Sequence, residues 1–155
     1  MKFMMNGALT VGTRDGATIE MAREAGEEHF CLFGLSAEQV LGSRGWYHPH
    51  WHYDHEPETR RALDMIVADA FSQAEPGIFA PIWDVLLTHG DYYMHLADLS
   101  AYVQAQAQVG MLFQQPKAWA RKAILNVGHS GKFSSDRTIA EYVAHIWKVK
   151  PCPVG

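Results

Sequence analysis

The chain begins with Met1-Lys2-Phe3-Met4-Met5-Asn6-Gly7-Ala8-Leu9-Thr10-Val11-Gly12. A single cation, Lys2, stands beside a run of large apolar residues, so we expect it to lie against buried surface. Residues 1–5 are compatible with the end of a helix, and the Asn-Gly pair that follows tolerates the left-handed backbone of a helix stop. Residues 8–12 have the β-branched content of a short strand. This stretch predicts a helix end, a stop and a strand.

The next residues extend this stretch into a β-α-β pattern. A turn signal, Thr13-Arg14-Asp15-Gly16, ends the first strand. From Thr18 a helix is predicted to near Gly26, because its apolar residues share one side: Ile19, Met21, Ala22 and Ala25. A second buried strand is predicted at residues 29–34. Strand, helix and strand in this order form the right-handed crossover unit of a parallel sheet.

The remainder of the chain has helical periodicity. Ser36 is a candidate cap of a short helix, whereas residues 42–57 show no clear period and are expected to be irregular. Further helices are predicted at 58–71, 78–87 and 92–113, and after Pro116. Ser134 or Ser135 is expected to cap a last helix, and its apolar stripe consists of Ile139, Tyr142, Val143, Ile146 and Trp147. We expect Tyr142 and Trp147 to pack in a core.

Two short strands are too few for an independent parallel sheet, whose strands need neighbours and helices on both faces. No repeat, low-complexity tract or long linker interrupts the chain. We therefore expect residues 1–155 to be a single segment without an internal boundary, and to form part of a larger, helix-rich α/β domain.

Composition narrows the possible partners and compartments. The net charge is -4 and the pI about 6.1, so the chain lacks the basic field that nucleic acid or anionic membranes attract, and we expect neither partner. Cys31 and Cys152 form no C-x-x-C pair, and a reducing compartment fits best. Nothing at the amino end has the pattern of a secretory signal.

A second candidate for chemistry is the segment His48-Pro49-His50-Trp51-His52-Tyr53-Asp54-His55. Imidazoles this dense could bind zinc or nickel. No H-E-x-x-H pattern accompanies them, however, and no predicted helix orients them. A surface loop with aromatic packing is the favoured interpretation, and no metal site is predicted.

Two separate motifs carry a family resemblance. Residues 1–10, followed by Asp15-Gly16-Ala17, resemble the pyridoxal-phosphate lysine segment of the glycogen, starch and maltodextrin phosphorylases. Residues 130–139, Ser-Gly-Lys-Phe-Ser-Ser-Asp-Arg-Thr-Ile, resemble the segment before the last helix of the same family. The spacing between the motifs also fits, and the resemblance covers essentially the whole chain.

The resemblance implies an α-1,4-glucan phosphorylase, which moves glucose from the non-reducing end of glycogen or maltodextrin onto inorganic phosphate and releases glucose 1-phosphate. Lys2 matches the lysine that forms the Schiff base with pyridoxal 5′-phosphate, and it is the catalytic and cofactor-binding position implied here. Apolar neighbours at residues 3–5 would favour the neutral amine that such condensation requires. In this family the cofactor's 5′-phosphate assists proton donation to the leaving glycosidic oxygen.

The implied fold is the glycosyltransferase type B fold. This chain would be part of its C-terminal, Rossmann-like, cofactor-binding domain, with a final crossover helix returning to the amino-terminal domain. The implied partners are the amino-terminal domain, the upstream half-domain and, when complete, a second copy in a cytoplasmic homodimer. The chain alone is expected to be inactive. The alternative is a non-catalytic α/β-helical binding module derived from the family.

Overall fold

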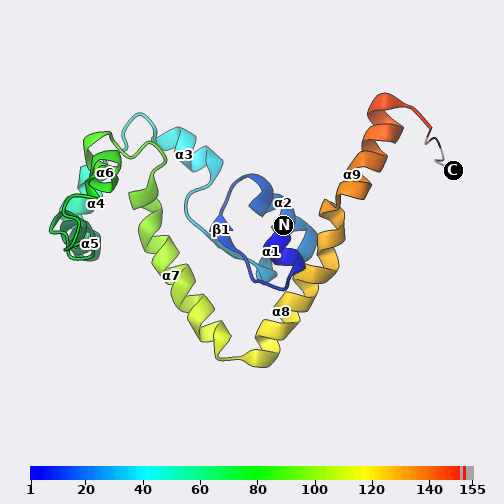
Figure 1. The fold of residues 1–155 in the computed structure, drawn as a ribbon, viewed down its shortest axis with the longest axis horizontal. Helices are drawn as coiled ribbons and strands as arrows, with labels where there is room; N and C mark the ends of the chain where they lie inside the picture. The colour runs from blue at the N-terminus through cyan, green and yellow to red at the C-terminus, as the bar shows by residue number, and fades with distance from the viewer. Residues whose placement is uncertain (151, 153–155) are drawn as a thin grey trace. The chain divides into compact units, whose positions relative to one another are not determined.

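The computed structural model describes residues 1–150 and 152, which form a helix-rich α/β structure (Figure 1). Within these residues the strands are β1 (Val11–Thr13) and β2 (Cys31–Phe33), paired in a small parallel sheet. The helix α2 (Gly16–Ala25) connects them. The backbone N–H of Cys31 donates to the Thr10 carbonyl at 2.9 Å. The predicted β-α-β unit is therefore confirmed, although each strand is only three residues long.

The other described helices confirm the helical character predicted for the rest of the chain. In chain order they are α1 (Lys2–Met5), α3 (Ala37–Ser43), α4 (Pro49–His55), α5 (Pro57–Val67), α6 (Ala80–Trp83), α7 (His95–Phe113), α8 (Pro116–His129) and α9 (Ser135–Glu141). Shorter turns accompany them: the 3₁₀ turns η1 (Glu27–His29) and η3 (Ser130–Phe133), and the π-helical turns η2 (Asp84–Thr88) and η4 (Tyr142–Trp147).

Two of the predicted caps are present. Ser36 forms a reciprocal capping box with Gln39: the Gln39 backbone N–H donates to Ser36 Oγ at 3.3 Å, and the Ser36 N–H donates to Gln39 Oε1 at 2.8 Å. Ser134, rather than Ser135, caps α9, because its Oγ accepts the Arg137 N–H at 3.2 Å. These side chains satisfy backbone donors that the first helical turn leaves free.

The expectation that residues 42–57 are irregular is wrong, because α4 lies within them. Pro49 occupies the first helical position, where the missing N–H has no intrahelical partner to lose and the fixed φ suits the helix. The Glu56 N–H still donates to the His52 carbonyl at 3.0 Å at the other end. Short helices rich in histidine and tryptophan lack a clear apolar period, which is why the sequence pattern missed this one.

The chain divides into two compact units, each formed by separate stretches. Unit 1 comprises residues 1–12, 16–31 and those from 110 onward, and unit 2 comprises residues 13–15 and 32–109. That residues 1–155 form one segment of a larger domain stays a prediction.

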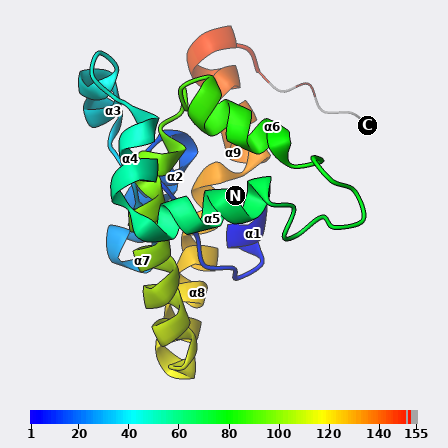
Figure 2. The ribbon, with the colours of Figure 1, turned by 90° about the vertical axis from the view of Figure 1, so that its left-hand side faces the viewer.

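Unit 1 has a small apolar core beneath α8. Its buried apolar residues come from α1, from α2 and from the approach to β2: Met4, Met21, Ala22, Ala25 and Phe30. Both α1 and α2 pack against α8, and Figures 1 and 2 draw α1 beside it. The buried side of α2 carries three of the four residues predicted from its periodicity.

Unit 2 has its own core where α5, η2 and α7 meet. Leu63, Leu87 and Leu96 are each 3% exposed. Four partly buried residues surround them: Tyr53, Ile66, Trp83 and Leu86. Figure 2 shows α5 beside α4 and α6, in agreement with their contacts. The branched leucine side chains exclude water here, and apolar burial of this kind is the main stabilising contribution to folding.

Asp91 is a fully buried carboxylate of unit 2 with three hydrogen-bond donors around it. The backbone N–H groups of His95 and Leu96 donate to it at 2.9 and 2.8 Å, and the Tyr47 hydroxyl donates at 2.7 Å. Asp91 thereby satisfies the first turn of α7 and ties it to the segment before α4. Burial, followed by this hydrogen bond, raises the pKa of the Tyr47 hydroxyl well above its ordinary value.

The expectation that the apolar stripe of the last helix packs in a core is wrong for this chain. Tyr142 and Trp147, predicted to pack in a core, are 44% and 54% exposed, and Ile139 and Ile146 are exposed as well. The reason is that α9 contacts chiefly η3 and η4, its neighbours along the chain, which leaves its apolar side uncovered by the described part of this chain. The helix itself is present as predicted.

Every helix of the described residues is too short or too polar to span a membrane.

We predict that Asp91→Ala destabilises the first turn of α7 by about 3 kcal/mol, because it leaves a hydroxyl and two backbone N–H groups buried without an acceptor. Tyr47→Phe removes one donor only and should cost about 1 kcal/mol. Hydrogen exchange of the amides at the start of α7, in the full-length protein, measures both losses. Equal effects of the two substitutions would contradict this account of Asp91.

The raised pKa of Tyr47 predicts a stability change in alkali. The folded chain favours the neutral phenol, so its contribution is complete below the ordinary tyrosine pKa of about 10 and declines as the pH rises above it. The stability advantage of the unmodified protein over Tyr47→Phe should therefore be full at about pH 8 and smaller at about pH 11. Urea denaturation at both pH values tests this, and an unchanged advantage would show that Tyr47 does not titrate in this way.

Candidate functional site

Lys2 is the first residue of α1, and its side chain is exposed. Two residues later Met4 is only 1% exposed, in the core of unit 1. The helix ends as predicted: the Asn6 side-chain amide donates to the Lys2 carbonyl at 2.8 Å, and Gly7 has a φ of +79°. Lys2 therefore projects from a helix of four residues whose position depends on Met4 and on this stop.

The expected apolar wall around Lys2 is present at Met4 only. Phe3 and Met5 are 81% and 59% exposed. Successive helical side chains point about 100° apart, so a single turn lying on α8 can bury only one of its faces. The apolar run at residues 3–5 predicted a buried environment for Lys2, but only Met4 is buried in this chain.

No carboxylate of the described residues is paired with the Lys2 amine. The ion pairs formed by residues 1–150 involve other cations: His29–Glu28, His52–Glu56, Arg60–Asp54 and Arg137–Glu141. The amine is exposed and not held by any of these acids. Such an amine is sterically accessible to a carbonyl group from outside this chain.

A groove of about 460 Å³ lies within unit 1, and Met1, the residue before Lys2, forms part of its wall. The other lining residues come from α2, η3 and α9: Glu20, Arg23, Glu24, Lys132, Phe133, Arg137 and Thr138. Arg137 already donates to Glu141 and to the Lys132 carbonyl. Three cations against two acids give only a small positive excess, so the groove is a weak anion site at most.

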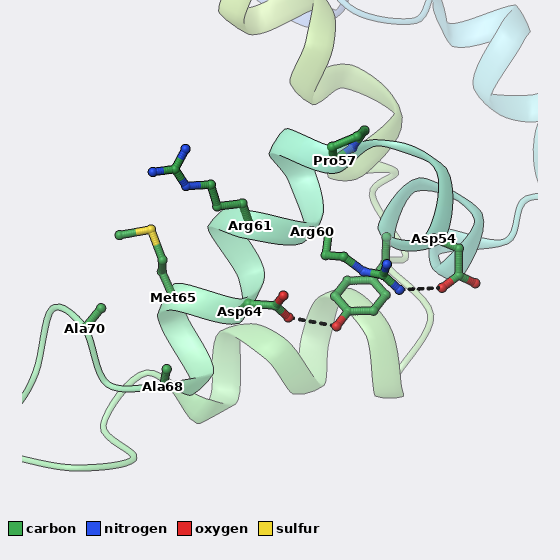
Figure 3. A pocket seen from close by; sticks show the side chains of 9 residues that line it. Asp54, Pro57, Arg60, Arg61, Asp64, Met65, Ala68 and Ala70 are labelled. Atoms are coloured by element: carbon green, nitrogen blue, oxygen red, sulfur yellow. Dashed lines mark hydrogen bonds and ion pairs between the residues drawn. The ribbon is translucent and has the colours of Figure 1, made fainter.

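A second groove, of about 420 Å³, lies in unit 2 between α4 and α5 (Figure 3). The Arg60 guanidinium lies 4.8 Å from the centroid of the Tyr53 ring and reaches Asp54 at 3.5 Å, while the Tyr53 hydroxyl donates to Asp64 at 2.7 Å. Figure 3 shows Arg61 pointing away from this cluster. Arg60, Asp54 and Asp64 interact with one another or with Tyr53, and these pairings compete with the binding of a ligand.

The hydrogen bond to Asp64 also raises the pKa of the Tyr53 hydroxyl. An ordinary tyrosine is already protonated near neutral pH, and this shift favours the protonated phenol further. The charge pairing in this groove does not indicate catalysis.

The histidine-rich segment has local structural partners. His52 Nδ1 lies 2.8 Å from Glu56 Oε1, and His55 Nδ1 lies 2.9 Å from the Trp51 carbonyl, with its ring stacked 4.9 Å from the Trp51 ring. Within the part of the chain that the structure describes, no three potential metal ligands converge. These local contacts show that the histidine-rich segment forms part of the surface of α4.

Sequence reasoning missed two buried polar residues, Asp91 and Asn126, both 0% exposed. Asp91 directly precedes the helix predicted at residues 92–113, a position where a side-chain carboxylate favours the start of a helix. Asn126 lies three residues after Ala123 on the side of α8 that faces the core. A polar residue at an apolar helical position was the available signal.

Comparison with known proteins identifies the class of protein. The family model described as carbohydrate phosphorylase matches residues 1–149, and the chain belongs to this family, whose glycogen phosphorylases are glycosyltransferases. Human brain-form glycogen phosphorylase is 51% identical over 152 residues, which is 97% of this chain and 18% of that protein.

Relatives outside mammalian brain are similar to the same extent. Glycogen phosphorylase of Chlamydia trachomatis is 49% identical over 149 residues, or 96% of this chain and 18% of that protein. The muscle form of sheep is 47% identical over 153 residues. The chain thus spans about 18% of the length of the curated relatives it matches.

Proposed function

We propose that this chain is the C-terminal part of an α-1,4-glucan phosphorylase, which transfers glucose from the non-reducing end of glycogen or maltodextrin to inorganic phosphate and forms glucose 1-phosphate. Family membership over residues 1–149 supports the reaction class. The observation that carries the assignment of a site is the exposed, uncommitted amine of Lys2, at the position of the family's cofactor lysine.

We propose that Lys2 holds pyridoxal 5′-phosphate as a Schiff base. The residues present fit covalent attachment: the amine is exposed, no described acid is paired with it, and Met4 anchors its helix in the core. When bound, the cofactor supplies a phosphate group for proton transfer next to the substrate phosphate.

The role of the chain's own residues in this proposal is to hold and orient. Lys2 provides the covalent attachment, Met4 keeps α1 against α8, and Asn6 and Gly7 end the helix so that the chain turns into β1. Positioning a reacting group in this way lowers the entropic cost of reaction. Exclusion of water from Lys2 would have to come from outside this chain, because Phe3 and Met5 are exposed.

The remaining components belong to the same proposal. Groups that bind the glucan and the substrate phosphate would come from upstream of these residues, so the isolated chain would be inactive. The full-length protein would include the amino-terminal domain and the upstream half-domain, and would act as a cytoplasmic homodimer.

For the fold we propose a partial Rossmann-like domain of the glycosyltransferase type B fold. In this arrangement α9 and η4 would cross to the amino-terminal domain. The support is the exposed apolar stripe of this segment, in which Ile139, Ile146 and Trp147 are 53%, 62% and 54% exposed. Apolar side chains aligned on one side of a helix mark a surface that packs against another element.

We predict that Lys2→Ala abolishes cofactor attachment in the full-length protein and reduces glucose 1-phosphate production to background, because no other residue replaces the covalent link. Lys117→Ala, at an exposed lysine of α8, is the matched control and should leave both unchanged. Visible absorbance and the mass of the borohydride-reduced peptide containing Lys2 measure attachment. An unmodified protein without cofactor would instead favour the non-catalytic binding module.

The proposed crossing of the last helix predicts that Ile146→Ser lowers the thermal midpoint of the full-length protein by about 1 °C. A buried isoleucine loses about 2 kcal/mol of apolar burial, and the unfolding entropy that converts this loss into a midpoint shift is that of a chain of which these residues are about 18%. His145→Ser, next to it but outside the stripe, is the control and should have little effect. Scanning calorimetry measures both midpoints. If the two substitutions lower the midpoint equally, the stripe is not an interdomain surface.

A further inference from the structure

Asn126 is the fully buried polar residue of unit 1. It lies in the second half of α8 and is 0% exposed. Among the described residues, neither its amide nitrogen nor its oxygen has a hydrogen-bond partner. Burying an amide without partners costs about 1–3 kcal/mol, so such groups in folded proteins are normally satisfied by protein or by an internal water.

The other buried side chains of unit 1 are apolar. The buried side chains of unit 1 are Met4 of α1, Met21, Ala22 and Ala25 of α2, and Phe30. Both α1 and α2 pack on α8, the helix that carries Asn126. None of these five side chains offers a hydrogen bond to an amide.

A second unpaired polar atom belongs to η1, which packs on α8. Lys122, one helical turn before Asn126, donates to the Glu28 carbonyl of η1. The next residue, His29, has a buried Nδ1 that also lacks a partner among the described residues. His29 and Asn126 together account for all buried side-chain polar atoms left unpaired in the part of the chain that the structure describes. His29 belongs to η1 and Asn126 to α8, and these two elements are in contact.

A water molecule is the ligand whose chemistry matches these atoms. It can accept from the Asn126 amide nitrogen and donate to an amide oxygen or an imidazole nitrogen, and internal waters typically make about three such bonds. We propose that Asn126 and His29 hold an internal water in the core of unit 1, and that this polar centre fixes α1 on α8 and so positions Lys2.

The link to Lys2 is mechanical. A helix of four residues has too few internal hydrogen bonds to be stable alone, so its position depends on the surface beneath it. That surface is α8, and Met4 is the side chain that α1 buries. Asn126 is therefore a positioning residue that acts through α8. Its relevance to cofactor attachment rests on the function proposed above for Lys2.

The experiment uses the full-length protein and three variants of α8. Asn126→Leu keeps similar volume but removes both polar atoms, whereas Asn126→Ser keeps a donor and acceptor and leaves room for water. Val127→Leu, at the exposed neighbouring position, is the matched control. Hydrogen exchange of the Met5, Asn6 and Gly7 amides reports the position of the Lys2 helix, because these amides donate to the carbonyls of Met1, Phe3 and Met4.

Asn126→Leu should accelerate exchange of these α1 amides by about 10-fold while amides of α7 in unit 2 stay unchanged, because the opening is local. Asn126→Ser and Val127→Leu should exchange like the unmodified protein. If the Asn126 side chain instead stays unpaired and holds no water, Asn126→Leu should leave α1 exchange unchanged or slow it, because apolar replacement of an unpaired polar group is neutral or stabilising. Unchanged α1 exchange in Asn126→Leu would overturn the proposal.

A high-resolution crystal structure of the unmodified full-length protein tests the water directly and does not depend on any variant folding. Water bonded to Asn126 would support the proposal, and an Asn126 amide bonded only to protein groups would overturn it. Borohydride-trapped cofactor on Lys2 is measured in the same samples. If the unmodified protein carries none, the proposed function fails, and α1 exchange alone still decides whether Asn126 positions this helix.

Discussion

The packing of Met4 against α8 is the contact on which the candidate site depends. A four-residue helix has no independent stability, so α1 exists where the core of unit 1 holds it. Lys2 gains a defined position from a neighbour two residues away, while its own side chain stays exposed. The same turn cannot bury Phe3 and Met5 as well, and the chain therefore presents an accessible amine that it does not itself enclose.

Buried polar groups distinguish the two units. In unit 2 Asp91 is surrounded by three donors: its carboxylate holds the start of α7 and, together with the larger effect of burial, raises the pKa of the Tyr47 hydroxyl. In unit 1 Asn126 is as deeply buried, but its amide has no protein partner among the described residues. Burial removes both side chains from water, which costs free energy. The hydrogen bonds of Asp91 offset this cost and stabilise one arrangement, whereas Asn126 needs a ligand or internal water to supply the missing bonds.

The exposed surfaces fit a chain that spans about 18% of its relatives' length. The stripe on α9 and η4 consists of large apolar side chains that no described element of unit 1 covers. By contrast the groove between α4 and α5 is bordered by charges that bind each other. The exposed apolar stripe on α9 and η4 indicates a packing surface, whereas the groove between α4 and α5 is an ordinary solvated face.

The sequence by itself determined the β-α-β unit, the caps at Ser36 and Ser134, the stop at Asn6-Gly7 and the family, because these features depend on residues close together in the chain. It did not reveal α4, whose histidines and aromatics hide the helical period, nor the exposure of Phe3, Tyr142 and Trp147. Only the tertiary structure decided which of the apolar side chains are buried. Burial depends on which distant segment covers each face, and the local pattern that forms a helix is the same whether that face is covered or not.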